Sequence, residues 1–482
     1  MSAAVGVPGS RTVSRIRPRL RRRETGLLVL VGVILVLGSV SLGATQRQLA
    51  GQAVTWLPAD TGQLVIYLGA LVAAHLALVL AGRRSDQVLL PTIGLLGGIS
   101  LLLMERLPQS LVTQSLAGRS FGLASIQLGW LVLAIAVITI AAIAVRSDAW
   151  LRRYKYTWAA AGIVLLLLTF LIGNEVNGAL LTITVGPISG QPTELIKVIL
   201  VIFLAGYLSD FRPLLVGASM RLGPLRLPPV PYLLPMFAMW AMALGIVVIQ
   251  RDLGAALLFF AVFLALVYIA TARASYVVLG LILFVVGSFI AYQLFGTVRD
   301  RVDIWLNPFV DASGKGYQVI QSLYAFGRGG IIGTGLGAGL PLVAGRLPIP
   351  AIHTDFPFAA LGEELGLIGV VAILELYLVV IERGLRIAAS AADDFRALLA
   401  AGLTLVVGVQ AFIIAAGNLK LIPLTGVTLP FISYGGSSLL ANGVVVGLLL
   451  ALSDRGVEPP PPPRPSRARR PGFLGGRPGG GR

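Results

Sequence analysis

Long apolar runs separated by short polar segments recur along almost the whole chain. Runs of about 18 to 25 residues are long enough to cross a bilayer as α-helices. The pattern therefore predicts an all-α, polytopic helical membrane protein with about 10–12 transmembrane helices. The runs fall near residues 26–45, 63–81, 88–104, 121–145, 157–173, 191–208, 232–250, 252–272, 275–295, 357–382, 396–417 and 435–453.

The composition agrees with a membrane-embedded chain. Of the 482 residues, 56% are hydrophobic and 12% are charged, whereas soluble domains carry about 25% charged residues. The chain has no cysteine, which excludes disulfide bonds and thiolate metal sites. Much of its net charge of +17 lies in the tails and short loops, so we expect contact with anionic membrane lipid and no nucleic-acid partner.

Basic residues in the short loops predict the orientation of the spans, because such residues are retained in the cytoplasm. We expect residues 1–24 to form a basic cytoplasmic tail, residues 25–453 a polytopic transmembrane domain, and residues 454–482 a disordered cytoplasmic tail rich in Pro, Arg and Gly. Counting three spans back from the C-terminal tail places a long loop, about residues 296–356, on the extracytoplasmic side.

Four polar clusters interrupt the apolar background, and the expected topology places all four on the outer side. Polar, non-helical backbone near a membrane must be buried in protein or line a wet cavity. The sequence therefore predicts a single outward-facing site. The clusters occupy residues 173–197, 250–254, 307–366 and 418–438.

The first two clusters each carry a pair of opposite charges. Glu194 and Lys197 are three residues apart, so they share one face of a helix and can pair, either as a structural ion pair or as part of a polar cavity. Arg251 and Asp252 either form a turn in the headgroup zone or hold an arginine ready for a phosphate, whose geometry a guanidinium matches.

The outer loop carries Gln318, Gln321 and Ser322 ahead of a glycine-rich stretch. This stretch is not a nucleotide-binding loop, because it lacks the required Lys-Ser/Thr pair and faces the wrong side for ATP. Three basic residues of the loop, Lys315, Arg328 and Arg346, either contact a diphosphate or are ordinary solvated charges.

The junction between the outer loop and the next apolar run holds three carboxylates, Asp355, Glu363 and Glu364, beside His353 and Thr354. A carboxylate where a loop enters the membrane is costly unless it has a function. Two interpretations of Asp355 stay open. It caps the following helix, since Asp is a favoured N-cap, or it takes part in chemistry.

Six stretches carry a resemblance to the SEDS family (shape, elongation, division and sporulation), which includes RodA, FtsW and SpoVE. The similarity runs from about Gly173 to Leu452. The matching stretches are Gln191-Pro-Thr-Glu194-Leu-Ile-Lys197, Gln250-Arg-Asp252-Leu-Gly254, Gly316-Tyr-Gln318 with Gln321-Ser322, His353-Thr-Asp355-Phe356, Gly362-Glu-Glu-Leu-Gly366 and Thr428-Leu-Pro-Phe-Ile-Ser433-Tyr-Gly-Gly-Ser437-Ser438.

The resemblance implies a SEDS-type fold and a peptidoglycan glycosyltransferase that polymerises lipid II at the outer face of the bacterial cytoplasmic membrane. It implies a class B penicillin-binding protein as the transpeptidase partner. It also implies that Asp355, which matches the essential aspartate of the family, is catalytic.

The chain departs from the family pattern at several points. It has Leu181-Thr182-Ile183 where the family usually has Arg-Trp-Ile, Arg251 where proline is common, and Ala351 where glutamate is common. It also has more apolar runs than the ten spans typical of the family. These differences point to a divergent branch or to extra N-terminal spans, and they leave a role in elongation or in division open, with a slight preference for elongation.

Lipid II polymerisation is a glycosyl transfer in which a sugar 4-hydroxyl attacks an anomeric carbon and undecaprenyl diphosphate leaves. We expect Asp355 to act as the general base. Stabilising the diphosphate requires Arg or Lys, or a divalent cation such as Mg²⁺, for which the sequence identifies no ligands. The expected substrate-binding residues are Glu194, Lys197, Arg251, Asp252, Gln318, Gln321, Ser322, Arg328, His353, Thr354, Glu363, Ser433, Ser437 and Ser438.

Two other functions are compatible with a polytopic chain. A lipid II flippase or transporter predicts polar groups near the membrane midplane and at both faces; the clustering on one side argues against it, although Glu375 is a mid-span carboxylate. A non-catalytic cell-wall scaffold predicts that the change Asp355→Asn leaves cell-wall synthesis intact.

Overall fold

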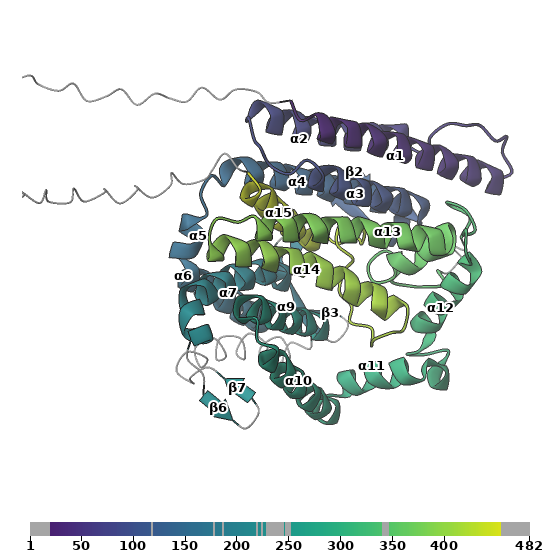
Figure 1. Cartoon of the computed structure of the whole chain (residues 1–482). Coiled ribbons are helices and arrows are strands. Elements are labelled where there is room, and N and C mark those ends of the chain that lie inside the picture. Colours follow the sequence, from purple (N-terminus) through teal and green to yellow (C-terminus); the bar gives the residue numbers. More distant parts are fainter. Residues whose placement is uncertain are drawn as a thin grey trace, which may run out of the picture.

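The computed structural model describes residues 20–116, 119–176, 179–185, 188–217, 220–222, 225–227, 245, 252–339 and 347–454. Within these ranges the chain is a bundle of long helices (Figure 1), and ten helices are long and apolar enough to cross a membrane. The predicted all-α membrane fold is confirmed. The predicted run at 232–250, Arg251, Arg346 and nearly all of both tails lie outside the described residues.

The long helices follow the predicted runs closely. A further apolar helix, α15 (Gly436–Leu452), is shorter. The ten candidate spans are α1 (Arg22–Leu49), α2 (Thr61–Leu80), α3 (Leu89–Arg106), α4 (Leu123–Ala144), α6 (Lys155–Ile172), α7 (Pro192–Gly217), α9 (Leu253–Thr271), α10 (Ala274–Leu294), α13 (Pro357–Ala389) and α14 (Asp394–Asn418).

The connections contain short elements that the apolar pattern did not predict. Three small antiparallel sheets occur, with strand orders β1-β2, β3-β4-β5 and β6-β7. The short helices are η1 (Gln109–Leu111), α5 (Ala149–Arg153), α11 (Gly296–Leu306), η2 (Pro308–Asp311) and α12 (Tyr317–Gly329). The strands are β1 (Gln114–Leu116), β2 (Arg119–Phe121), β3 (Asn174–Val176), β4 (Ala179–Val185), β5 (Ile188–Gly190), β6 (Met220–Leu222) and β7 (Leu225–Leu227).

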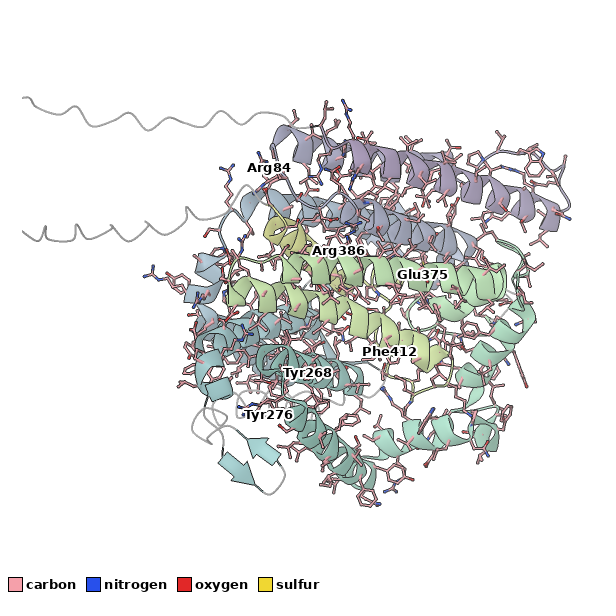
Figure 2. All side chains as sticks on the ribbon, viewed as in Figure 1. Arg84, Tyr268, Tyr276, Glu375, Arg386 and Phe412 are labelled. Carbon is pink, nitrogen blue, oxygen red and sulfur yellow. The ribbon has the colours of Figure 1, made fainter. Side chains whose placement is uncertain are left out.

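Helix α14 lies at the centre of the bundle, where it packs against α7, α9, α13 and α15. Its buried residues Leu399, Leu403, Val407 and Ile414 recur at helical spacing and face these neighbours. On the other face Phe412 is exposed, and Figure 2 shows it at the bundle surface. This helix therefore joins the N-terminal and C-terminal halves of the fold.

Glycines of α3 attach the first two spans to the rest of the bundle. A Cβ added at Gly98 would lie 2.3 Å from a Leu35 methyl of α1, and one at Gly97 would lie 2.5 Å from the Tyr67 hydroxyl of α2. That hydroxyl donates to the carbonyl of Gly94 at 2.7 Å. Small residues that admit a neighbouring side chain are a common basis of packing between membrane helices.

The four polar clusters come together at one end of the bundle, as predicted. Segments from all four clusters meet at this end, which we call the loop end. The Gln191 N–H donates to Ser437 Oγ, the Tyr434 N–H donates to the His353 carbonyl, and the Thr193 hydroxyl lies 3.4 Å from the Asp252 carboxylate. Residues 20 and 454 lie at the opposite end, the terminal end (Figure 1).

A backbone break in α13 ties the outer loop to the bundle. Gly366 has φ of 64° inside this helix, a conformation that favours glycine, and a Cβ there would lie 2.3 Å from the Gly333 nitrogen. The break leaves the carbonyls of Glu363 and Glu364 without helical partners. They accept instead from the backbone N–H groups of Thr334 and Gly335, at 3.0 and 2.9 Å. The loop after α12 thus completes the hydrogen bonding of α13.

Candidate active site

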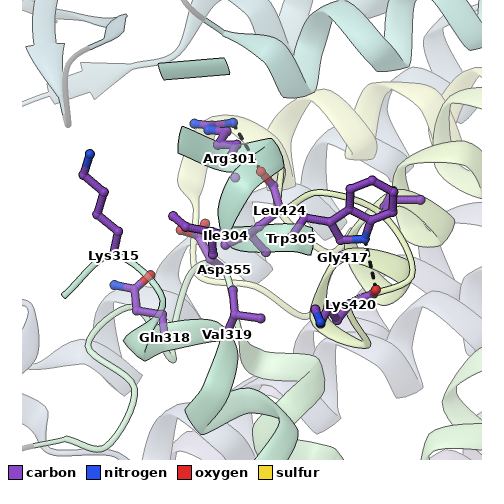
Figure 3. Close-up of a pocket in the computed structure, with 12 residues that line it drawn as sticks. Arg301, Ile304, Trp305, Lys315, Gln318, Val319, Asp355, Gly417, Lys420 and Leu424 are labelled. Carbon is purple, nitrogen blue, oxygen red and sulfur yellow. Dashed lines mark hydrogen bonds between the residues drawn. The ribbon is translucent and has the colours of Figure 1, made fainter. Parts of the chain in front are cut away.

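A cavity of about 170 Å³ opens at the loop end, between α11, α12, the segment before α13 and the loop after α14 (Figure 3). Segments far apart in sequence contribute to it, so it exists only in the folded chain. Its lining residues are Arg301, Ile304, Trp305, Lys315, Gln318, Val319, Asp355, Gly417, Lys420, Ile422, Leu424 and Gly426.

Asp355 is fixed in the cavity wall by its backbone. Its N–H donates to the Ala351 carbonyl at 2.9 Å, and its own carbonyl accepts from the side-chain amide of Asn418 at 2.9 Å. Helix α13 begins at Pro357 with Phe356 at the N-cap position and no side-chain cap. The interpretation of Asp355 as the helix cap is therefore wrong, and its half-buried carboxylate faces the cavity instead.

Arg301 is the basic residue whose charge acts on the Asp355 carboxylate. Its Nη1 donates to the Thr425 carbonyl at 2.9 Å and to the Leu424 carbonyl at 3.5 Å, and on the same helix Trp305 donates to the Lys420 carbonyl at 3.1 Å. These bonds hold α11 across the loop after α14, as the dashed lines in Figure 3 show. Sequence reasoning missed Arg301.

Burial and charge act in opposite directions on this pair. Burial raises the pKa of Asp355 from 3.8 to about 6, while Arg301 works to lower it. Burial lowers the pKa of Arg301, and the neighbouring carboxylates of Asp252 and Asp355 raise it. At neutral pH the cavity therefore holds the Asp355 carboxylate and the Arg301 guanidinium. Because the pKa of Asp355 is close to neutral pH, this carboxylate can accept a proton and release it again.

The predicted pair Glu194 and Lys197 is confirmed, with Lys197 Nζ 2.6 Å from the Glu194 carboxylate. The buried Lys197 also donates to Gln410 Oε1 at 2.7 Å and to Asn442 Oδ1 at 3.3 Å. The amide of Asn442 donates in turn to Ser438 Oγ at 3.2 Å. This network joins α7, α14 and α15 behind the cavity, and neither member of the pair belongs to the described cavity lining.

Asp252 connects this network to the cavity. Its Oδ1 accepts from the Ala255 N–H at 3.0 Å, which makes Asp252 the N-cap of α9, and its Oδ2 lies 3.4 Å from the Thr193 hydroxyl. Burial raises the pKa of Asp252, whereas the charge of Arg301 acts to lower it. Asp252 therefore bears on the cavity through charge and not by lining it.

The predicted residues around Asp355 shape the backbone. The His353 carbonyl accepts from the Tyr434 N–H at 2.8 Å, and the Thr354 hydroxyl lies 3.4 Å from the Ala351 carbonyl. Ser433 Oγ accepts from the Leu429 N–H at 2.8 Å. Ser437 Oγ accepts from the Gln191 N–H at 3.0 Å. The predicted residues His353, Thr354, Ser433, Ser437 and Ser438 are absent from the described cavity lining.

Of the predicted residues on α12, Gln318 lines the cavity and Gln321 does not. The buried Ser322 donates to the Asn418 carbonyl at 2.9 Å. Arg328 lies 3.4 Å from the Glu363 carboxylate, so this cation, a candidate for the diphosphate, already has an acidic neighbour.

The donor groups at the cavity do not form a metal site by themselves. Within the described ranges, no group of three or more His, Asp or Glu side chains is placed to hold a metal ion. Asp355 is the one carboxylate among the described lining residues.

Comparison with known proteins gives a consistent result. The family model FtsW/RodA/SpoVE, described as cell cycle protein, matches residues 86–456. The peptidoglycan glycosyltransferase RodA of Mycobacterium bovis is 40% identical over 439 residues, which cover 90% of this chain and 91% of the relative. The probable peptidoglycan glycosyltransferase FtsW of Geobacter metallireducens is 36% identical over 330 residues, covering 67% and 84%.

A solved structure extends the similarity to three dimensions. It concerns structural coordination of polymerization and crosslinking by a peptidoglycan synthase complex, and one of its chains matches with a TM-score of 0.59 and 27% identity. The match covers 77% of this chain and 98% of that chain. The family model begins at residue 86, after α2, so α1 and α2 precede the family region, in line with the expected extra N-terminal spans.

The buried network predicts a large difference between two lysines. Lys197→Ala should destabilise the protein by about 3–5 kcal/mol, because it leaves a buried carboxylate and two amide oxygens without their cation. Lys315→Ala removes an exposed pair with Asp300 (62% and 46% exposed) and should leave the melting temperature nearly unchanged, because exposed ion pairs contribute little. Thermal unfolding of both variants in the same detergent measures the difference. Equal melting temperatures would contradict a structural role for Lys197.

Proposed function

The chain belongs to the FtsW/RodA/SpoVE family of cell cycle proteins and is a peptidoglycan glycosyltransferase, and on that premise we propose that Asp355 is its general base. The observation that carries the proposal is that the half-buried Asp355 and Arg301 line one cavity at the loop end, where the charge of Arg301 acts on the Asp355 carboxylate. The proposed substrate is lipid II, which supplies both the attacking sugar hydroxyl and the diphosphate leaving group.

The proposed step requires a base and a stabiliser of negative charge. Asp355 takes the proton of the attacking 4-hydroxyl while the new glycosidic bond forms, a contribution of roughly 10²- to 10⁴-fold to the rate. The bond from the anomeric carbon to the diphosphate breaks, and its electron pair leaves with undecaprenyl diphosphate. A carboxylic acid with a pKa of about 6 is largely ionised at neutral pH and is a stronger base than an ordinary aspartate.

Arg301 is the proposed stabiliser of the departing diphosphate. Its Nη1 is occupied by two backbone carbonyls, and a guanidinium has further N–H donors beyond that nitrogen. Lys315 and Lys420 add positive charge to the same lining. A diphosphate at this position would lie against fixed donors that need no rearrangement during the reaction. Two other predicted basic residues have acidic partners away from this cavity: Lys197 pairs with Glu194, and Arg328 lies 3.4 Å from Glu363.

The loop end is proposed to face the outside of the cytoplasmic membrane, with both termini inside. The terminal end carries arginines in several of its short connections, including Arg83, Arg84, Arg146 and Arg273, as the orientation rule for basic loops requires. Lipid II polymerised at the outer face would then meet Asp355 directly.

The proposed partner is a class B penicillin-binding protein that binds the outer face of α13. The related solved chain comes from a complex of polymerization and crosslinking. On α13, Glu375 is an exposed carboxylate in the middle of a span, and Figure 2 shows it on the bundle surface. Charges at that depth are costly and are normally paired. A partner helix with a hydrogen-bond donor at this level would satisfy it. This position also argues against a transporter, whose intramembrane charges face an interior pathway.

Replacement of Asp355 by Asn should leave folding and partner binding intact and lower glycan polymerisation by 10²-fold or more, because an amide cannot accept the proton. The measurement is glycan chain formation from lipid II by the purified complex. Asp303→Asn is the matched control, since Asp303 is an exposed carboxylate on the same helix as Arg301 and accepts from Tyr292. Near-normal synthesis by the Asp355 variant would refute the mechanism and favour a scaffold.

The pH profile of the same assay separates a base from a purely structural carboxylate. The wild-type rate should rise with pH and reach half its maximum near pH 6, as Asp355 ionises. Arg301→Gln removes the charge that lowers this pKa, so the midpoint should move to higher pH while the maximal rate falls. A midpoint that does not move with Arg301 would show that another group titrates.

The proposed orientation can be tested by labelling, because the chain has no native cysteine. A cysteine at the exposed position Ser313, in the outer loop, should react with a membrane-impermeant thiol reagent on intact cells. The control is a cysteine at the exposed position Ser147, at the terminal end, which should react only after permeabilisation. The reverse pattern would invert the orientation.

The partner surface can be tested with Glu375→Leu, which removes the carboxylate and suits a lipid-facing position. Binding of the penicillin-binding protein should weaken roughly 3- to 30-fold, the range expected for an interhelical polar contact of about 0.6–2 kcal/mol. Ile140→Leu on the exposed face of α4 is the matched control. Unchanged co-purification of the partner with the Glu375 variant would remove α13 from the interface.

A further inference from the structure

A second cavity, of about 640 Å³, lies at the terminal end, opposite the Asp355 site. It is formed by the start of α1, the connection between α2 and α3, the last turns of α13 and the end of α15. None of these residues has a part in the proposed glycosyl transfer. The lining residues are Arg23, Arg84, Ser85, Asp86, Gln87, Val88, Arg383, Arg386, Ile387, Ser390 and Ser453.

Four arginines from three different elements face this cavity, and they are only partly neutralised. Arg383 and Arg386 pair with the exposed Glu382 on their own helix. No ion pair of Arg23 or Arg84 occurs among the described residues. The cavity therefore carries a net positive charge.

Asp86 is the one carboxylate among the described lining residues, and it accepts hydrogen bonds mainly from the backbone of its own segment. Its Oδ1 accepts from the backbone N–H groups of Val88 and Leu89, at 2.8 and 3.0 Å, and so holds the start of α3. Its Oδ2 lies 3.7 Å from Arg383, a long contact at the edge of the cavity. Asp86 therefore leaves most of the arginine charge uncompensated.

The cavity sits at the ends of spans and continues into apolar surface. Figure 2 shows Arg84 and Arg386 toward the terminal end, with Glu375 further along α13. Below the arginines, α13 exposes Leu378 and Leu385, and α1 exposes Leu30. Both helices contribute residues to the cavity, and each carries exposed apolar residues further along the same helix. A molecule with a charged head and hydrocarbon chains suits this arrangement better than a soluble anion does.

We propose that this cavity binds the phosphate headgroup of an anionic membrane lipid. Guanidinium groups match phosphate oxygens in pairs, and basic pockets between membrane helices are typical binding sites for multiply charged lipid headgroups. With four arginines, a lipid that carries two phosphates fits best. The bound lipid joins α1, which precedes the family region, to α13, the helix that begins just after Asp355.

The test uses native mass spectrometry of the full-length protein in neutral detergent, titrated with cardiolipin, phosphatidylglycerol or phosphatidylcholine. The variant Arg84→Gln/Arg386→Gln removes two cavity charges without touching Arg383 or Asp86. The control Arg146→Gln/Arg153→Gln removes two exposed arginines at the same end but outside the cavity. Size-exclusion profiles and melting temperatures establish that all variants are folded.

Wild type and control should retain cardiolipin in preference to phosphatidylcholine, and the cavity variant should bind it on the order of tenfold more weakly or worse. If both double variants bind cardiolipin equally weakly, the binding depends on general surface charge and not on the cavity, and the proposal is overturned. Displacement of cardiolipin by inorganic pyrophosphate at similar concentration would identify a soluble-anion site and overturn the lipid assignment. Absence of selective cardiolipin binding by wild type would also overturn it.

Discussion

The left-handed backbone at Gly366 is the constraint on which the loop end depends. A helix that continued without a break would use the carbonyls of Glu363 and Glu364 internally. The break offers both to Thr334 and Gly335, so the loop that follows α12 is held against α13 by backbone hydrogen bonds. Helix α12 precedes this loop and contributes Gln318 and Val319 to the cavity lining. The break in α13 therefore helps to position this part of the cavity wall.

Polar groups at the loop end differ from polar groups buried deeper in the bundle in how they are hydrogen-bonded and in what they can do. At the loop end, the pKa values of Asp355 and Arg301 respond to burial and to the charge of the other residue. Groups deeper in the bundle, such as Lys197 with Gln410 and Asn442, are hydrogen-bonded on several sides. In a low-dielectric interior, an unsatisfied charge would destabilise the fold, so reactivity is confined to the rim.

The sequence predicted those features that depend on local periodicity. The run at 121–145 became α4 (Leu123–Ala144), and the three-residue spacing of Glu194 and Lys197 placed them in contact. Features set by distant segments escaped prediction. Arg301 acquires its place through carbonyls more than a hundred residues away in sequence, at Leu424 and Thr425. Its one local signal was a short charged run, Arg299-Asp300-Arg301-Val302-Asp303, directly after an apolar span.

Proline and long-range pairing account for two further differences. Asp355 looked like a helix cap, but Pro357 starts α13 two residues later and leaves Phe356 in the cap position. Arg328 looked available for a diphosphate, but the fold brings Glu363 to within 3.4 Å of it. Pro357 was a local signal for the first, because proline is favoured at the first position of a helix. The second could not be read from spacing, since it depends on where the loop meets α13.

The glycine-lined face of α3 has a consequence for how this protein relates to shorter members of its family. A Cβ added at Gly98 would lie 2.3 Å from a Leu35 methyl of α1, so a larger residue at this position would require the Leu35 side chain to move. The first two spans pack on different neighbours, α1 against α3 and α2 mainly against α4. The site at Asp355 and the central helix α14 lie within residues 86–456, the region that the family model matches, whereas α1 and α2 precede it.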